Sequence, residues 1–418
     1  MPSLARAWVW SAASILIKLG AGLLLIKWLA LAFGPEGMGR AGNFMALITV
    51  LSVLSGAGIY NGVIKYVAEF QFDVVRLHRL FSTSMVIVLG SSTLLALVLI
   101  CAAAPLSRLL FGDEGLQDVL RATACIQFGI AFANFFLAIL KGWRDAAGTA
   151  LSVIGGSLLG LCAYWAAFHF GGYAGALIGL VLMPALLALP AGVVLFKRGI
   201  VSLSRLRLTW DKKLAHGLFK FTAMAVTTSV TLPIAYFIIR KLLAAHYGWE
   251  EVGIWQGMNK ISDAYLQLIT APFTVYLLPT LSRQKKRADL AHEIGRAQRF
   301  LLPLALAMSL SIWLLRDMVI ALLFSADFRP MRNLFAWQLS GDIFKVGAYL
   351  FGYLIIAKAS LRFYVLAEFT QFSLIILFSY WLIPMSGALG TVQAYAATYS
   401  VYFAVCACVF LIYCKRGE

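Results

Sequence analysis

Residues 27–39 read KWLALAFGPEGMG, and residues 241–253, 214 positions further along, read KLLAAHYGWEEVG. Lys, Leu, Ala, Gly, Glu and Gly coincide between the two stretches without a gap. The basic turn at Lys141 has a counterpart at Lys358, and the Gly-Ala-Leu triplet at 175–177 has one at 387–389. Three matches in the same order indicate that the chain is a duplication of one unit.

The composition of the chain indicates that both copies lie in a membrane. Of the 418 residues, 61% are hydrophobic and 13% are charged, whereas a soluble domain carries roughly 25% charged residues. The mean hydropathy is +0.86. A spanning helix needs about 20 mostly apolar residues, and a transmembrane β-barrel would instead show short segments of alternating polarity. Twelve apolar windows have the length for a helix: 8–33, 41–65, 81–104, 119–140, 149–170, 174–196, 217–246, 252–281, 300–324, 333–357, 361–383 and 388–413.

The predicted fold is an all-α polytopic membrane protein of about twelve transmembrane helices in two six-helix bundles. The first window is too long for a cleaved signal peptide, so we expect a permanent helix. Six is an even number, so both copies enter the membrane in the same orientation, with the substrate bound between them. Residues 198–215 are the expected cytoplasmic linker between a bundle over 1–197 and a bundle over 216–418. Rocking of one half against the other would then give alternating access.

The net charge of +17 reflects membrane topology. Most of the 35 Lys and Arg residues lie in alternate gaps between the windows, and the other gaps, such as 169–172 and 384–387, are short and poor in basic residues. This is the positive-inside pattern, and it places both termini in the cytoplasm. Attraction to anionic membrane lipid follows, and no nucleic-acid partner is implied.

Two of the windows carry charged residues at positions where a bilayer makes them costly. A charge at the bilayer centre costs roughly 2.5–3.5 kcal/mol, so such residues usually face an interior cavity. Each set recurs at i, i+4, i+7 and i+11, which is one stripe of a helix. We expect both stripes to line a substrate-binding cavity, with pairing of each Lys to the Asp three residues away as the alternative. The stripes are Gln256, Lys260, Asp263 and Gln267 in one window, and Gln338, Asp342, Lys345 and Tyr349 in the other.

Further polar residues are candidates for the same cavity or for its mouth. Lys18 lies well inside the first window, and Arg240 can reach either the cavity or the interface. Lys27 and Lys241 lie near the outer helix ends, where snorkelling to the interface is expected. A cytoplasmic mouth, or alternatively a set of solvated helix ends, is predicted from Asn61, Lys65 and Glu69, which share a helix face, and from Lys141.

Signatures of catalysis are missing from the sequence. There is no Gly-x-x-x-x-Gly-Lys loop, no cluster of metal ligands and no outer loop large enough for a polymerase or glycosyltransferase site. We therefore predict a transporter without a cofactor or metal rather than an enzyme. Three deep lysines against two deep aspartates favour an anionic lipid-linked sugar, because Lys binds phosphate as a point charge. A transporter of cationic drugs would instead suit a cavity with isolated carboxylates and aromatic rings.

Several long segments resemble the Wzx-type lipid-linked oligosaccharide flippases, and the resemblance runs over essentially the whole chain. They are LLAAHYGWEEVGIWQG (242–257), FAWQLSGD (335–342), IAKASLRFY (356–364), GAGIYNG (56–62) and KGWRDAAG (141–148). The resemblance implies the fold of the multidrug/oligosaccharidyl-lipid/polysaccharide exporter superfamily, with two six-helix bundles forming a V-shaped central cavity.

The same resemblance implies a substrate and a direction of transport. The substrate would be undecaprenyl pyrophosphate carrying an acidic trisaccharide, moved from the cytoplasmic to the periplasmic leaflet of the bacterial inner membrane. The polymerase and chain-length proteins of the same pathway would be functional partners. A cation- or proton-coupled multidrug antiporter of the same superfamily is the alternative. The family has no short catalytic signature, so the site residues rest on the argument from helix faces.

Overall fold

The computed structural model describes residues 4–200, 209–273, 277, 280–281, 284, 286–357 and 361–415, and nearly all of them are helical. Part of the expected linker over 198–215 and the basic residue Lys358 lie outside the described residues. Seven helices in the described part of the chain are long and apolar enough to cross a membrane. The predicted class, an all-α multi-pass membrane protein, is therefore confirmed.

The chain forms two compact units. Unit 1 comprises Met1–Leu25 and Asn43–Pro233, and unit 2 comprises Ile26–Gly42 and Ile234–Glu418. The bundle bounds expected from the sequence, 1–197 and 216–418, stay a prediction. Unit 1 contains most of α1 (Leu4–Leu54), then α2 (Tyr60–Phe70), α3 (Val74–Cys101), α4 (Ala103–Phe111), α5 (Gln117–Gly142), α6 (Ala146–Ala185), α7 (Ala188–Lys197) and α8 (Lys212–Phe219). Unit 2 contains most of α9 (Thr222–Pro272), then α11 (Arg287–Leu314), α12 (Arg316–Leu323), the 3-10 helix η3 (Ala326–Leu334), α13 (Phe335–Ala357) and α14 (Leu361–Lys415).

Four of the long helices are interrupted at a glycine with positive φ: Gly34 in α1, Gly172 in α6, Gly248 in α9 and Gly387 in α14. Glycine adopts this conformation without the steric cost that other residues meet. All four glycines fall in gaps between the apolar windows of the sequence. The spans that contain them are 46, 52, 46 and 53 residues long, about twice the 20 or so residues that cross a bilayer. Each of these helices is therefore long enough for two spans that meet at the glycine.

Packing across the Gly172 break shows that the chain folds back on itself in unit 1. A Cβ on Gly175 would overlap the carbonyl oxygen of Ala167, just before the break. Further from the break, a Cβ on Gly160 would lie 2.9 Å from the Cα of Met183. The contacting residues lie at similar distances in sequence before and after the break, which indicates an antiparallel hairpin. Small residues such as these glycines allow two membrane helices to approach closely.

The predicted window 41–65 is wrong as a single helix, because a turn separates α1 from α2. Gly58 in that turn has a φ of 72°. The break leaves the carbonyl of Ser55 without a helical partner, and the hydroxyls of Ser91 and Ser92 donate to it at 2.6 and 2.8 Å. A neighbouring helix thus satisfies the backbone, as membrane proteins require where a helix is broken.

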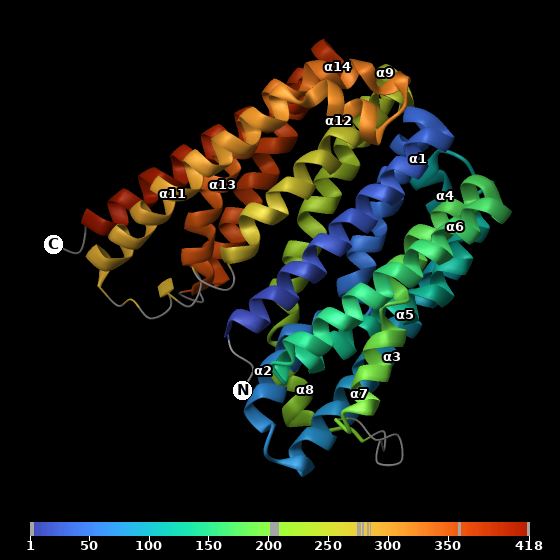
Figure 1. Cartoon of the computed structure of the whole chain (residues 1–418), viewed down its shortest axis with the longest axis vertical. Helices are drawn as coiled ribbons and strands as arrows, with labels where there is room; N and C mark the ends of the chain where they lie inside the picture. Colours follow the sequence, from blue (N-terminus) through green and yellow to red (C-terminus); the bar gives the residue numbers. More distant parts are fainter. Residues whose placement is uncertain are drawn as a thin grey trace. The chain divides into compact units, whose positions relative to one another are not determined.

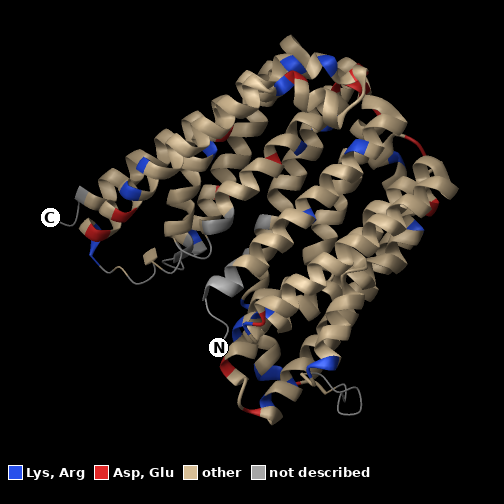
Figure 2. Cartoon of the chain, viewed as in Figure 1, with Lys and Arg blue, Asp and Glu red and all other residues tan. Residues whose placement is uncertain are grey.

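Apart from Lys18 in α1, the charged residues that the structure describes in unit 1 lie near helix ends (Figure 2). Helix α3 carries Arg76 and Arg79 in its first two turns and no Asp, Glu, Lys or Arg after them, and α6 carries none at all. The second half of α3 instead exposes apolar side chains such as Leu94 and Leu97. Apolar exposure along a helix that has its charges at one end is the pattern expected for contact with lipid.

In unit 2, helices α11, α13 and α14 pack side by side (Figure 1). This unit also holds both copies of the repeated stretch. A Cβ on Gly39 would overlap the carbonyl oxygen of Trp249, and a Cβ on Gly253 would overlap that of Pro35. Gly253 lies 214 positions after Gly39, and Trp249 lies 214 positions after Pro35, so the two contacts involve equivalent positions of the two copies. The two copies therefore meet through reciprocal contacts.

Candidate substrate-binding site

The interior of unit 2 holds the carboxylate of Asp342 on α13, which has no exposed surface. Three hydroxyls donate to this carboxylate: Ser262 and Tyr265 of α9 at 2.7 Å each, and Tyr395 of α14 at 2.6 Å. The amide nitrogen of Gln338, one turn earlier on α13, lies 3.4 Å from Oδ1. A buried carboxylate is costly unless donors satisfy it. These hydrogen bonds offset that cost, and they tie α13 to α9 and α14.

Lys345 lies one turn after Asp342 and is 7% exposed. Its Nζ is 5.2 Å from the ring centroid of Tyr399, 5.3 Å from that of Tyr395 and 5.7 Å from that of Tyr349. A cation over an aromatic face gains roughly 2 kcal/mol or more when it is desolvated. In the described part of the chain Lys345 makes no ion pair with Asp342. On α13, Asp342 is therefore satisfied by hydroxyl groups and Lys345 lies among aromatic rings, in place of the Lys–Asp pairing that the sequence offered as the alternative.

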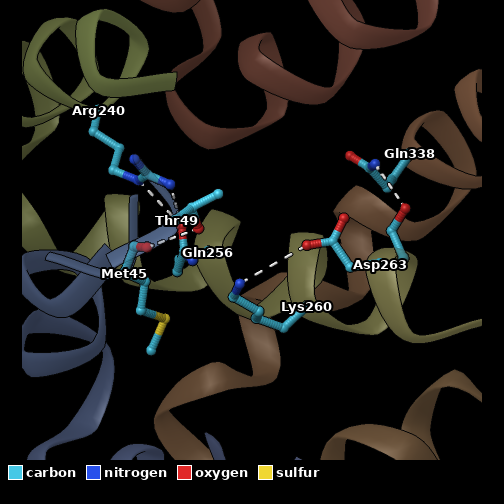
Figure 3. A network of polar contacts seen from close by, with 8 residues as sticks. Met45, Thr49, Arg240, Gln256, Lys260, Asp263 and Gln338 are labelled. Atoms are coloured by element: carbon cyan, nitrogen blue, oxygen red, sulfur yellow. Dashed lines mark hydrogen bonds and ion pairs between the residues drawn. The ribbon is translucent and has the colours of Figure 1, made fainter. Parts of the chain in front are cut away.

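The stripe on α9 has different surroundings (Figure 3). Lys260 Nζ lies 3.8 Å from Asp263 Oδ2, and the two side chains are 26% and 55% exposed. Gln256, one turn before Lys260, is buried, whereas Gln267, one turn after Asp263, is exposed. This stripe therefore runs from the interior of unit 2 to an accessible ion pair that a polar ligand can reach.

Arg240 is buried next to the first residue of that stripe. Its Nε and Nη2 both donate to Oε1 of Gln256 at 3.1 Å (Figure 3), and its guanidinium lies 5.8 Å from the ring of Trp255. Its Nη1 is buried and has no acceptor among the described residues. A Cβ on Gly42 would lie 2.9 Å from Arg240 Nε, so the guanidinium packs closely against this glycine. The two N–H groups of Nη1 thus remain available for an anionic oxygen.

Unit 2 therefore brings three cations onto α9 and α13: Arg240, Lys260 and Lys345. Arginine presents a planar fork of donors that matches phosphate, and lysine presents a compact point charge. A group of three His, Cys, Asp or Glu side chains that suits a metal ion is not found in the described ranges. The chemistry that this arrangement supports is the binding of an anion, with Asp263 as a competing carboxylate beside Lys260.

The remaining candidates belong to unit 1. Lys18 is exposed on α1, and Lys141 is exposed near the end of α5. Asn61, Lys65 and Glu69 lie on the exposed face of α2, as their spacing predicts. Lys65 also lies 5.3 Å from the ring of its neighbour Tyr66. The structure thus places the α2 residues on a common face, and their assignment to a cytoplasmic mouth stays a prediction.

Residues 4–285 of the chain match the family model described as polysaccharide biosynthesis protein. The chain belongs to this family. It is 58% identical over 415 residues to the lipid III flippase of Escherichia coli (strain K12) and, likewise, to that of Shigella flexneri, covering 99% of this chain and 100% of each relative. Both relatives are named as flippases, which are transporters and not enzymes.

Solved structures place this family member in a known fold. An inward-facing multidrug resistance MATE family transporter of the MOP superfamily superposes with a TM-score of 0.80, at 14% identity over 98% of each chain. The lipid II flippase MurJ in an inward closed conformation gives a TM-score of 0.73, at 14% identity over 96% of this chain and 87% of that chain. At this identity the likeness is one of fold alone.

In this member of the family, the donors around Asp342 are the site residues that the sequence argument missed. Ser262 and Tyr265 lie in the window of the α9 stripe, and Tyr395 and Tyr399 lie one turn apart on α14. Tyr399 also accepts a hydrogen bond of 2.6 Å from Gln371. Tyrosine is counted among the hydrophobic residues of an apolar window, so the window does not register its hydroxyl group as a hydrogen-bond donor. The i, i+4 spacing of Tyr395 and Tyr399 does indicate that both tyrosines lie on one helix face, but it does not indicate which residues that face contacts.

Proposed function

We propose that this protein moves lipid III of enterobacterial common antigen, an undecaprenyl-pyrophosphate-linked oligosaccharide, from the cytoplasmic to the periplasmic leaflet of the inner membrane. The observation that carries the proposal is the 58% identity, over 99% of this chain, to two relatives named lipid III flippase. The cations inside unit 2 give it a chemical basis, since a pyrophosphate entering an apolar membrane protein needs charged donors.

We assign binding of the pyrophosphate to Arg240, Lys260 and Lys345. Each charge-assisted hydrogen bond to a phosphate oxygen contributes about 1.5–3 kcal/mol. Lys260 is the accessible member of the three, and Arg240 has a buried donor without an acceptor in the described part of the chain. Gln256, Gln267 and Asp263 flank these cations on α9, and Lys18 is the candidate from unit 1. Asp342 holds the helices that carry Lys260 and Lys345, and acts as a positioning residue.

The architecture that goes with this function is two six-helix bundles that form a V-shaped cavity and work by alternating access. The four glycine-broken helices, counted twice, give eleven spans together with α3, α5 and α11. We take α13, which is 23 residues long, as the twelfth. The reciprocal contacts of Gly39 and Gly253 support an origin by duplication. Parallel repeats of this kind bind substrate near the bilayer midplane, at the interface of the repeats.

Topology and partners complete the proposal. Both termini lie in the cytoplasm, as the positive-inside pattern indicates. Asn61, Lys65, Glu69 and Lys141 then lie at the cytoplasmic mouth, where the substrate enters. The polymerase and chain-length proteins of the same pathway would receive the product in the periplasmic leaflet.

A leaflet assay tests the proposal. The purified protein is reconstituted into liposomes that carry an undecaprenyl-pyrophosphate-linked saccharide, and exchange between leaflets is followed with a membrane-impermeant reagent that modifies the sugar. We expect wild-type protein to exchange the lipid faster than protein-free liposomes do, and the Lys260→Ala variant to exchange it more slowly. Equal rates with and without wild-type protein would overturn the proposal.

A cation- or proton-coupled multidrug antiporter is the second candidate. It is favoured by the fold shared with a multidrug resistance MATE family transporter. The 14% identity of that likeness makes it the weaker candidate beside the 58% identity to named flippases. The same liposomes decide the matter, because an antiporter would move a fluorescent cationic dye against an imposed proton or sodium gradient, and a flippase would not.

A further inference from the structure

An apolar groove of about 300 Å³ lies within unit 2, between α13 and the two arms of α14. Each of these three helical segments contributes one stripe of residues at helical spacing. Phe351 comes from α13, Leu366 and Ala367 come from the first arm of α14, and Cys406 and Phe410 come from the second. The groove is therefore formed by three packed helical segments of unit 2, and it does not depend on the position of a single side chain.

The position of the groove determines the kind of molecule that fills it. Both arms of α14 belong to one apolar span, Arg362–Cys414. The floor of the groove is aromatic, because the rings of Phe351 and Phe410 are 5.3 Å apart. Along a membrane-spanning segment the surrounding solvent is hydrocarbon, so a hollow lined by apolar side chains takes up a hydrocarbon chain.

Cationic side chains lie at one end of the groove. Arg287 packs its guanidinium 4.4 Å from the ring of Tyr413, which lines the groove, and donates to the carbonyl oxygen of that residue at 2.9 Å. A second hollow shares Leu366 with the groove and carries Arg362 on its wall. Both arginines are close to the two ends of α14, far along the helix from the Gly387 break. By the positive-inside pattern this end faces the cytoplasm.

We infer that this groove holds the polyprenyl tail of the substrate in the cytoplasmic leaflet, with the anionic head group near Arg287 and Arg362. The inference rests on the proposed function and names a binding site for the part of the substrate that the cationic residues cannot hold. A single groove receives a single chain, and a polyprenyl lipid has one chain where a phospholipid has two. The arginines match the negative charge of a pyrophosphate at its end.

Filling the groove tests the inference. Ala367→Phe and Cys406→Phe place a ring in the groove, and Leu377→Phe on the same helix is the matched control because Leu377 is exposed and does not line the groove. In the leaflet assay we expect each groove variant to raise the KM for the undecaprenyl-linked saccharide about tenfold, which corresponds to roughly 1.4 kcal/mol. The KM for Leu377→Phe should stay unchanged. Equal KM values for groove and control variants would overturn the inference.

Photolabelling tests the groove independently of transport. An undecaprenyl phosphate with a diazirine in its tail is irradiated with the intact wild-type protein, and the labelled residues are located by mass spectrometry. We expect labels on α14 at the groove, reduced by the Cys406→Phe change and by excess unlabelled undecaprenyl phosphate. Equal displacement by phosphatidylglycerol would assign the groove to phospholipid and overturn the inference. If wild-type protein took this label but failed to exchange the substrate between leaflets, the proposed function would fail and the groove would stand.

Discussion

The stripes on α9 and α13 have the same spacing and the same pair of charged residue types, yet their surroundings differ. On α9, Lys260 and Asp263 lie 3.8 Å apart and are 26% and 55% exposed. On α13, Asp342 is fully buried and accepts hydrogen bonds from three hydroxyls, and Lys345 lies among tyrosine rings. Helical spacing therefore determines which residues share a face, and the neighbouring helices determine what that face does.

The energetic consequences of the two environments also differ. An exposed ion pair contributes about 0–1 kcal/mol, because water or lipid head groups replace it at little cost. A buried polar group that loses its partner costs about 1–3 kcal/mol. We therefore expect the buried carboxylate of Asp342 to matter most for the stability of unit 2, and the accessible residues of α9 to matter for binding and not for stability.

The largest effect should follow from removal of the buried carboxylate. The Asp342→Ala change leaves the hydroxyls of Ser262, Tyr265 and Tyr395 without their acceptor, so we expect a loss of roughly 3 kcal/mol in the free energy of unfolding. Denaturant unfolding of the purified protein in detergent measures it. Asp342→Asn keeps one acceptor oxygen and should lose about half as much.

The matched control for this prediction is Asp263→Ala, in which the exposed carboxylate of the other stripe is removed. It should change the free energy of unfolding by less than about 0.5 kcal/mol. If the two alanine variants were equally stable, the proposed difference between the stripes would be wrong.

A second effect should follow from removal of the buried amine. Lys345→Met keeps most of the side-chain volume and removes the charge, so the protein should insert normally. A cation held in an apolar interior contacts phosphate without competition from water, and we expect the transport rate to fall about 30-fold, equivalent to roughly 2 kcal/mol. The measurement is the leaflet assay at equal protein content. Normal transport by this variant would show that Lys345 only packs against its tyrosines.

Most of the fold was predictable from the sequence because a membrane restricts the options. Apolar length gives the spans, and the gaps between windows contain Gly34, Gly172, Gly248 and Gly387, where the structure breaks its helices. The turn at 55–59 was missed, because a hydropathy average does not register a glycine pair that ends a helix inside an apolar window.

The site was predictable only in part. Helical spacing selected Asp342 and Lys345 as partners on one face, but it gave no sign that Tyr395 and Tyr399, more than fifty residues further along, would surround them. Such contacts depend on how α14 packs against α13, which no local pattern contains. For the same reason, the sequence did not reveal that Arg240 bonds to Gln256 across the Gly248 break.

A third, smaller effect tests the accessible lysine. Lys260→Ala removes a cation that water partly solvates, so its phosphate contact lies at the lower end of the range for charged hydrogen bonds, near 1.5 kcal/mol. We expect the KM to rise about tenfold with the free energy of unfolding unchanged. Lys260→Arg should restore most of the affinity, which a merely structural lysine would not do. A change in unfolding that matches that of Asp342→Ala would contradict this assignment.

The smallest effect should come from Asp263→Asn, and it has the opposite sign. In the free protein this carboxylate lies 3.8 Å from Lys260 and competes with an incoming phosphate for the same ammonium group. Removing its charge should lower the KM about two- to threefold, because an exposed ion pair is worth only a few tenths of a kcal/mol. The gain should shrink at about 1 M salt, where the Debye length falls to about 3 Å and exposed charges at this separation are screened. An unchanged KM at low salt would mean that the α9 pair stays closed when substrate binds, and that Lys260 and Asp263, like Asp342, hold the fold rather than the ligand.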